Sequence, residues 1–307
     1  MNIKRKELVE ALECVYPAIG TNALLPVFQN IKVSGKTVEG TDGSIKIETQ
    51  LSQDIEMEFC VNGSGFLGLL RSLRCEDINI ELKGNMLHVL TSKLEGNFKL
   101  TENAKFPRIQ FSEEVAGLED PEGLSLALSM CKLGVSQDET AGVLCGVMFT
   151  PAGEGENTYL YSSDRFRILR AKWNNPYTKP FSLPIKFIDI LQKVMNKVIL
   201  MDFTGERFQV ELEDGTKMST LVYGGEFRDL GIFFPGEDAA NVVIGFDDEF
   251  KDIFNRHTQF VKGMDMVDKE ISIHISEGVC RLKHMPISWA SWKRKPVLTL
   301  KKRLCST

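Results

Sequence analysis

The chain has 307 residues, of which 43% are hydrophobic, so it is long enough for two or three compact domains. Its formal net charge of −5 argues against a surface generally coated with nucleic acid, while a basic patch on one face stays compatible with it. The charged start and the lack of an apolar run near the roughly 18 residues of a membrane span predict a soluble, cytoplasmic protein. Seven scattered cysteines, without disulfide or zinc spacing, fit reduced core residues.

The first segment, residues 1–56, predicts a strand, a helix and three further strands. Leu8, Leu12 and Val15 share one side of the helix expected over residues 5–16, which Pro17 ends. The strands are expected at residues 2–4, 27–33, 37–41 and 44–51. The second segment, residues 57–109, repeats this order. Its strands are expected at residues 59–61, 78–82, 86–90 and 96–100, and its helix at residues 66–73.

The later segments follow the same plan. Residues 123–177 predict a strand and short helix over 124–135, a polar loop over 136–140, and strands at 143–150, 158–161 and 166–173. Residues 181–229 predict a strand at 181–184, a helix over 185–198 and three strand-like runs separated at residues 204–206 and 213–215. Residues 242–295 predict a strand at 242–246, a helix from 248 to about 261, and strands at 271–275 and 278–284.

A unit that recurs at this spacing is an internal repeat, and here two related half-units alternate. Polar stretches that contain Gly or Pro, at residues 117–121 and 235–238, mark the expected boundaries. The sequence therefore predicts an α+β fold with three domains, at residues 1–118, 119–235 and 236–307, the last one shortened and ending in a basic tail.

Several stretches resemble one family in the same order along residues 1–235. The first is Leu-Leu-Pro-Val-Phe-Gln-Asn-Ile at residues 24–31, followed by Gly-Thr-Asp at 40–42. Gln137-Asp138, Gly-Val-Met-Phe at 146–149, Ser163-Asp164 and Arg167 come next, and Leu-Val-Tyr-Gly-Gly-Glu-Phe-Arg-Asp at 221–229 closes the series. This pattern resembles the DNA polymerase III beta subunit, the bacterial-type sliding clamp.

The resemblance implies a ring whose helices line a central hole and whose strands form the outer wall. It implies a non-enzymatic processivity factor without a cofactor that tethers the replicative DNA polymerase to double-stranded DNA and is placed there by a clamp loader. A typical member has six half-units, whereas five can be traced here. A closed ring then needs a homo-oligomer joined head to tail, with a dimer as first choice and a trimer as second.

A ring that tolerates DNA without reading its sequence needs basic helix faces. Lys186, Lys193 and Lys197 fall on one side of the helix expected over residues 185–198. For any single helix, lysines that are simply solvated are the alternative. The resulting DNA-binding candidates, with Gln137 taken from the resemblance, are Lys186, Lys193, Lys197, Arg71, Arg74, Lys251, Lys262 and Gln137.

The resemblance also implies a hydrophobic pocket on the second domain, where polymerases and loaders insert short peptides. Family members usually have glycine and histidine at the positions of Arg165 and Phe166. The alternative is that the Ser163-Asp164 turn and the apolar residues serve the fold alone. The predicted wall consists of Leu144, Ser163, Arg165, Phe166, Arg167, Ile168 and Pro235, and a displaced site would fall on the basic tail at residues 293–303.

Catalytic and metal-binding constellations are absent from the sequence pattern. The four histidines are dispersed, and Asp247-Asp248-Glu249 fits the start of a helix better than a metal site. Two alternatives to a sliding clamp stay open. One is a clamp-like adaptor or decoy that does not close, and the other is an enzyme with a small-substrate cleft between the repeats, which would need a metal or a titrating carboxylate.

Overall fold

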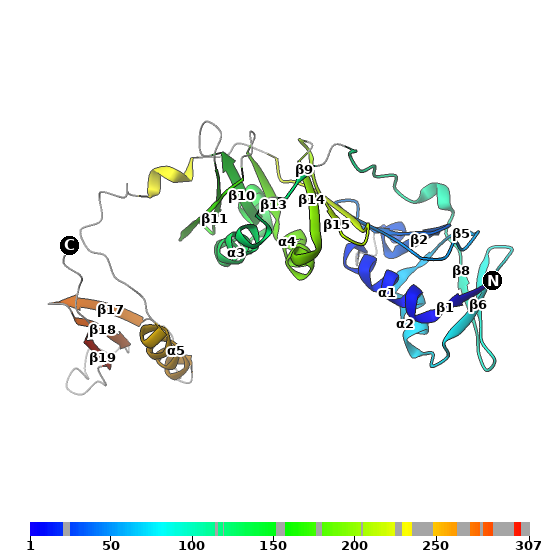
Figure 1. Cartoon of the computed structure of the whole chain (residues 1–307), viewed down its shortest axis with the longest axis horizontal. Coiled ribbons are helices and arrows are strands. Elements are labelled where there is room, and N and C mark those ends of the chain that lie inside the picture. Colours follow the sequence, from blue (N-terminus) through cyan, green and yellow to red (C-terminus); the bar gives the residue numbers. More distant parts are fainter. Residues whose placement is uncertain are drawn as a thin grey trace. The chain divides into compact units, whose positions relative to one another are not determined.

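The structure is a computed structural model, and the chain divides into two compact units, Met1–Leu230 and Gly231–Thr307 (Figure 1). It describes residues 1–20, 25–113, 116–118, 120–151, 157–175, 180–203, 205–224, 229–234, 248–262, 271–276, 279–284 and 298–301.

The N-terminal half of the first unit consists of two half-units that exchange their first strands. The elements of the first half-unit are β1 (Asn2–Lys4), α1 (Arg5–Val15), β2 (Asn30–Ser34), β3 (Thr37–Thr41) and β4 (Ile45–Gln50). Those of the second are β5 (Glu58–Asn62), α2 (Gly63–Ser72), β6 (Asp77–Lys83), β7 (Met86–Leu90) and β8 (Glu95–Lys99). Strand β1 pairs with β6 and strand β5 pairs with β2, so each half-unit completes the sheet of the other.

The C-terminal half of this unit repeats the exchange. Its first elements are β9 (Ala116–Gly117), α3 (Pro121–Cys131), β10 (Gly146–Pro151), β11 (Thr158–Ser163) and β12 (Ile168–Trp173). They are followed by β13 (Phe181–Pro184), α4 (Ile185–Val194), β14 (Val198–Phe203), β15 (Arg207–Leu212) and β16 (Lys217–Leu221). Strand β13 pairs with β10, and strand β9 pairs with β14. The α+β fold and the predicted repeat are thereby confirmed.

The two halves share one sheet. Strand β4 pairs antiparallel with β16, with Ile47 opposite Met218, which gives an eight-stranded sheet in the order β5-β2-β3-β4-β16-β15-β14-β9. The other two sheets of the unit run β1-β6-β7-β8 and β12-β11-β10-β13. Helices α1 to α4 lie on the same side of the eight-stranded sheet (Figure 1).

The core forms where the apolar stripes of the helices meet the sheets. Leu8, Leu12 and Val15 of α1 are buried, as their spacing predicts. In the C-terminal half, Phe181 stacks on Phe149 and Phe203 with ring centroids 4.5 Å and 4.3 Å away. Stacked rings in a closed core contribute stability beyond the area that they bury.

Several predicted boundaries are wrong. The helix expected over residues 185–198 ends at Val194, and the short 3-10 helix η6 (Met195–Lys197) leads into β14, so Val198 is a strand residue. Residues 27–29 and 143–145 were expected in strands but belong to the 3-10 helices η2 (Pro26–Gln29) and η5 (Glu139–Cys145), because the chain turns there before it extends. The strand expected from Leu124 is wrong, since α3 already begins at Pro121, after an N-cap in which Asp120 accepts from the Gly123 backbone N–H.

The remaining 3-10 helices are η1 (Tyr16–Ala18), η3 (Asn103–Lys105), η4 (Lys132–Gly134) and η7 (Leu230–Phe233). The second unit contains α5 (Asp248–Lys262), β17 (Ile271–Ser276), β18 (Val279–His284) and β19 (Leu298–Lys301). The predicted helix and two strands are confirmed there, and β19 adds a strand inside the stretch expected to be a basic tail. The strand expected at residues 242–246 lies outside the described residues. None of the helices in the described parts of the chain is long and apolar enough to cross a lipid bilayer.

Candidate nucleic-acid interface and partner site

The three lysines predicted on one helix face have different surroundings. Lys186, the second residue of α4, places its Nζ 2.5 Å from the Oδ2 of Asp42 in the N-terminal half. Lys193 lies in the last turn of α4, and Lys197 ends η6, so the single helix that was to carry all three stops before the third. Both Lys193 and Lys197 are exposed. Exposed ammonium groups are available to phosphates, whereas an ion-paired one must first leave its carboxylate.

The cations predicted on α2 also separate. Arg71 donates from Nε to the Oε1 of Glu13 on α1 at 2.9 Å, and its Nη2 lies 2.8 Å from the same oxygen. Arg74 is exposed but falls in the loop after α2, which ends at Ser72, so Arg71 and Arg74 do not share a helix face. The structure thus turns Arg71 toward the neighbouring helix.

The other candidates are spread over the chain. Gln137 is exposed in the loop before η5. Lys251 is exposed on α5 and pairs with Asp248 at 3.1 Å, one helical turn earlier. Lys262 is the last residue of α5, and its side chain lies outside the described part of the chain. The two candidates on α5 belong to the second unit and the others to the first.

The predicted partner site centres on the tight turn between β11 and β12. The Oδ1 of Asp164 accepts from the backbone N–H groups of Phe166 and Arg167 at 3.1 Å and 3.0 Å, and its Oδ2 accepts from the Arg167 Nε at 2.8 Å. Arg165 has a φ of 77°, in the left-handed region that favours glycine. The turn projects Phe166 into solvent, with 96% of its surface exposed.

A second loop meets this turn. The Nη1 of Arg165 lies 3.8 Å from the Oδ2 of Asp138. The hydroxyl and the backbone N–H of Thr140 donate to Asp138 and hold the pKa of its carboxyl below the usual value. The structure therefore brings the loop that begins η5 next to the β11–β12 turn.

The apolar members of the predicted wall are only partly assembled. Leu144, near the end of η5, is half-buried. Ile168, the first residue of β12, is also half-buried and lies opposite the buried Ser163 of β11. Pro235 lies outside the described residues. Ser163 serves the turn itself, because its Oγ accepts from the Arg165 backbone N–H at 3.1 Å.

One exposed apolar face was missed by the sequence reasoning. Leu126, Met130 and Leu133 are 64%, 48% and 68% exposed along α3 and η4, while Leu124 and Leu128 of the same helix are buried. Leu126, Met130 and Leu133 have the spacing of one helix face, so the sequence could have indicated this apolar face. The buried face of the helix has the same spacing, so the pattern alone does not tell which face is exposed. The nearby cation Lys132 pairs with Asp189 of α4.

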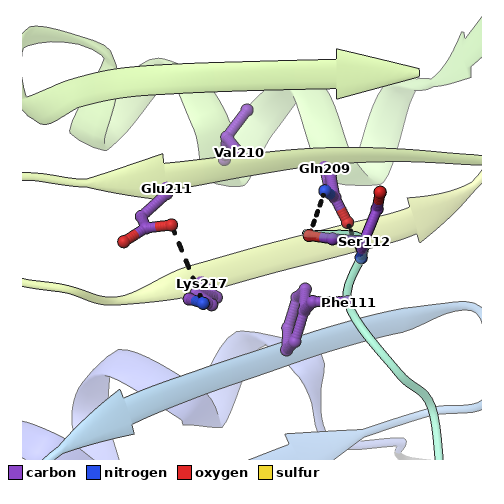
Figure 2. Close-up of a pocket in the computed structure, with 6 residues that line it drawn as sticks. All are labelled: Phe111, Ser112, Gln209, Val210, Glu211 and Lys217. Atoms are coloured by element: carbon purple, nitrogen blue, oxygen red, sulfur yellow. Dashed lines mark hydrogen bonds and ion pairs between the residues drawn. The ribbon is translucent and has the colours of Figure 1, made fainter. Parts of the chain in front are cut away.

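Two cavities in the described structure lie away from both predicted sites. One, of about 280 Å³, is lined by Tyr16, Ile19, Gly20, Gln29, Asn62 and Ser64. The other, of about 10 Å³, lies under the connection between the two halves and holds no more than one water molecule (Figure 2). Its lining residues are Phe111, Ser112, Gln209, Val210, Glu211 and Lys217.

This connection is fastened to the outer face of the shared sheet. Gln209 of β15 accepts from the Ser112 backbone N–H at 2.9 Å and donates to the Ser112 carbonyl at 3.0 Å (Figure 2). The Nζ of Lys46 donates to the Ile109 carbonyl at 2.9 Å and lies 4.9 Å from the centre of the Phe111 ring. The segment that leads from one half to the other is therefore bound across the strands that join them.

The part of the chain that the structure describes contains no group of three or more His, Cys, Asp or Glu side chains suited to a metal ion. The cysteines Cys14, Cys60, Cys75, Cys131 and Cys145 are free. Burial raises the pKa of the Cys60 and Cys131 thiols to about 12, so neither is a ready nucleophile near neutral pH.

The comparisons agree on one family. Residues 1–110 match the family model of the DNA polymerase III beta subunit, N-terminal domain. The beta sliding clamp of Bacillus subtilis (strain 168) is 23% identical over 212 residues, which cover 63% of this chain. The matched stretch spans 56% of that relative, little more than half of its length.

Solved structures match over nearly the whole chain. The sliding clamp of Bacillus subtilis superposes with a TM-score of 0.81 at 17% identity, over 98% of this chain and 83% of that one. A Pseudomonas aeruginosa sliding clamp bound to griselimycin gives the same TM-score at 15% identity, with the same coverage of both chains. The beta subunit from Streptococcus pyogenes has a TM-score of 0.75 at 16% identity, over 99% and 84%. The chain therefore has the fold of the sliding clamps, and its residues 1–110 match the N-terminal domain of the DNA polymerase III beta subunit family.

Proposed function

We propose that the protein is a DNA sliding clamp, a processivity factor without enzymatic activity that encircles duplex DNA and tethers a replicative polymerase. The observation that carries this proposal is the single eight-stranded sheet that continues through the β4–β16 pairing from one pair of half-units into the next. A sheet that continues across a repeat boundary, with the helices on one side, is the arrangement that a ring wall requires. The Bacillus subtilis relative is a beta sliding clamp, which supports the same proposal.

The domains follow from the repeats. The pairs of half-units in the first unit correspond to clamp domains at residues 1–118 and 119–235, and residues 236–307 form a shortened third domain. Strand β9 lies at the end of the first range but pairs with β14 of the second. Strands β8 and β12 each pair on one side only among the described residues, so each offers a free edge for continuing the wall. A head-to-tail homo-oligomer closes the ring, with a dimer as first choice and a trimer as second.

DNA contacts in this proposal are few and independent of sequence. Lys193, Lys197 and Arg74 present exposed charges, while Lys186, Arg71 and Lys251 are held by carboxylates. Gln137 and Lys262 remain candidates at the edges of their elements. A small number of phosphate contacts suits a ring that must slide, because retention is then topological and not a matter of affinity.

Partners that dock by a short peptide use the β11–β12 turn. Phe166, Leu144 and Ile168 supply apolar surface there, and Arg165 and Arg167 attract an acidic flank. A replicative polymerase and a clamp loader are the proposed occupants, as the resemblance implies.

The decisive experiment measures retention on circular DNA. The full chain is assembled on nicked circular plasmid with its loader and passed through a sizing column at moderate salt, before and after the plasmid is cut once. The proposal requires retention on the circle and release from the linear product. The double variant Lys193→Glu/Lys197→Glu should lower retention, because it removes two phosphate contacts. Each contact removed should also reduce the slope of log K against log salt concentration by about one.

A matched control is Lys36→Glu/Lys93→Glu, which makes the same charge change at two exposed turns. Equal losses in the two double variants would reflect net charge alone and remove Lys193 and Lys197 from the interface. Light scattering that finds only a monomer at micromolar concentration, together with equal retention on cut and circular plasmid, would instead favour the adaptor that does not close.

A further inference from the structure

We propose that Asp42 is a positioning residue that sets the angle between the two halves of the first unit through its ion pair with Lys186, with Arg207 bound to the same turn. This inference rests on the proposed clamp function, in which the angle between successive repeats determines whether the wall closes into a ring.

The two carboxylate oxygens of Asp42 act on different halves. Its Oδ1 accepts from the backbone N–H groups of Ser44 and Ile45 at 2.9 Å and 2.7 Å, which shapes the turn between β3 and β4. Its Oδ2 accepts from the Nζ of Lys186 on α4 at 2.5 Å. The Asp42 side chain is 16% exposed and the Lys186 side chain 53% exposed, so the carboxylate is largely shielded from water while the ammonium group reaches it.

A second cation reaches the same turn. Arg207 of β15 donates from Nη2 to the Ser44 carbonyl at 2.7 Å, and its Nε and Nη2 donate to the Oγ of Ser219 at 3.3 Å and 3.1 Å. Burial lowers the pKa of Arg207, and the charge of Asp42 opposes that effect. The tip of the β3–β4 hairpin therefore lies between two cations of the other half.

The position of this link matters more than its strength. The β4–β16 ladder joins the halves within the sheet, and adjacent strands accommodate a range of twist, roughly 10° to 35°. Lys186 stands on a helix outside the sheet. A contact from the hairpin to this helix resists bending about the β4–β16 line, which backbone hydrogen bonds in the sheet alone do not.

The same contact explains why Lys186 is a poor candidate for a phosphate contact. Its charge is engaged within the protein, and a phosphate would have to displace Asp42. Of the lysines predicted on this face, Lys193 and Lys197 remain available for DNA contacts. Lys186 instead links the two halves through its ion pair with Asp42.

The test measures the angle directly and without DNA. Spin labels carried by non-natural residues replace the exposed Lys93 in the N-terminal half and the exposed Lys172 in the C-terminal half, and pulsed dipolar spectroscopy gives the distance distribution between them. Asp42→Asn keeps an oxygen for the turn but loses the charge. We expect Asp42→Asn and Lys186→Ala each to broaden and shift the distribution, and the double variant to match the single ones, because both remove one link.

The control is Asp54→Asn. Asp54 accepts from the Glu56 backbone N–H at 2.8 Å within one half, so its distribution stays that of the parent. An unchanged distribution in Asp42→Asn, or additive effects of Asp42→Asn and Lys186→Ala, overturns the inference even if the parent protein is retained on circular plasmid. If the variants shift the distance distribution but circular plasmid does not retain the parent protein, the Asp42–Lys186 link is supported and only the clamp function is overturned.

Discussion

Gln209 binds Ser112 as a neighbouring strand would, with one hydrogen bond accepted from the backbone N–H and one donated to the carbonyl. The side chain of Gln209 is buried, with 4% of the residue exposed. Gln209→Ala removes both hydrogen bonds to Ser112, and a typical intramolecular hydrogen bond contributes about 0.5–1.5 kcal/mol. We expect the free energy of unfolding in urea to fall by this order and protease cleavage to rise between residues 106 and 113.

Gln50→Ala is the matched control for that change. Gln50 bonds Thr37 on an exposed surface, so its loss should shift stability by no more than about 0.5 kcal/mol. Equal cleavage of the two variants would mean that Gln209 does not fasten the connection.

Lys46 lies between two carboxylates on the outer face of the shared sheet. Its Nζ is 2.9 Å from Glu39 and 3.0 Å from Glu48, and its side chain is 7% exposed. Lys46→Met keeps the volume but leaves the carboxylates facing each other, and removal of one partner from a buried ion pair costs about 3–5 kcal/mol. Because Glu39 and Glu48 retain some contact with solvent, we expect the lower end of that range in chemical denaturation.

Lys217→Met gives the comparison for Lys46. Lys217 is 42% exposed and lies 3.8 Å from Glu211, so its pair is worth less than about 1 kcal/mol. If both methionine variants unfold at the same urea concentration, the ion pairs of Lys46 contribute no more to stability than the pair of Lys217.

Substitutions of Phe166 and Phe181 distinguish an effect on peptide binding from an effect on folding. Phe181→Ala removes a buried ring that stacks on Phe149, Phe203 and Phe208, and we expect a loss of about 3–5 kcal/mol. Phe166→Ala should leave the melting temperature unchanged, because the ring is almost entirely in solvent. A fluorescent peptide with an apolar anchor and an acidic flank, titrated by anisotropy, should bind Phe166→Ala more weakly than the parent, and unchanged affinity there and in Ile168→Asp would rule out this turn as the docking site.

Acid should loosen the loop that carries Asp138. The folded-state pKa of Asp138 lies below the ordinary value of 3.8, chiefly because the Thr140 hydroxyl and then its backbone N–H donate to the ionised carboxylate. The stabilisation is therefore present above about pH 4 and is lost as the pH falls through the lower folded value. The protection factor of the Thr140 amide against hydrogen exchange should fall across that interval, and Asp138→Asn should remove this fall; an equally steep fall in Asp138→Asn would assign it to another group.

Local patterns predicted elements but not their ends. The helix of Leu8, Leu12 and Val15 was found because its period is clear and Pro17 follows it. Val198 continued the helical period and was assigned to the helix, although the backbone is already extended there, because an apolar residue suits a buried helix and a buried strand equally. Strand β9 has two residues, Ala116 and Gly117, neither of which carries a β signal.

The candidate sites show the limit more sharply. The Asp42 turn and the Lys186 helix were each recognised in the sequence, but their ion pair joins positions 144 residues apart, which no local pattern encodes. Family members usually have glycine at the position of Arg165, and this glycine is consistent with the left-handed backbone found there. The charge pairing of Arg71 with Glu13 depends on the packing of α1 beside α2, so the helical wheel of α2 alone could not reveal it.

The exchange of first strands has a consequence for synthesis on the ribosome. Strand β1 leaves the ribosome long before its partner β6, since Ile3 is opposite Ile78. Until then Ile3 has no sheet to join, and the hairpins β2–β3 and β3–β4 are the pairings that can close early, because short loops are entropically cheaper than long ones. The same delay recurs between β9 and β14, with Ala116 opposite Met201, so a nascent chain that stalls inside a half-unit exposes an unfinished sheet edge to aggregation.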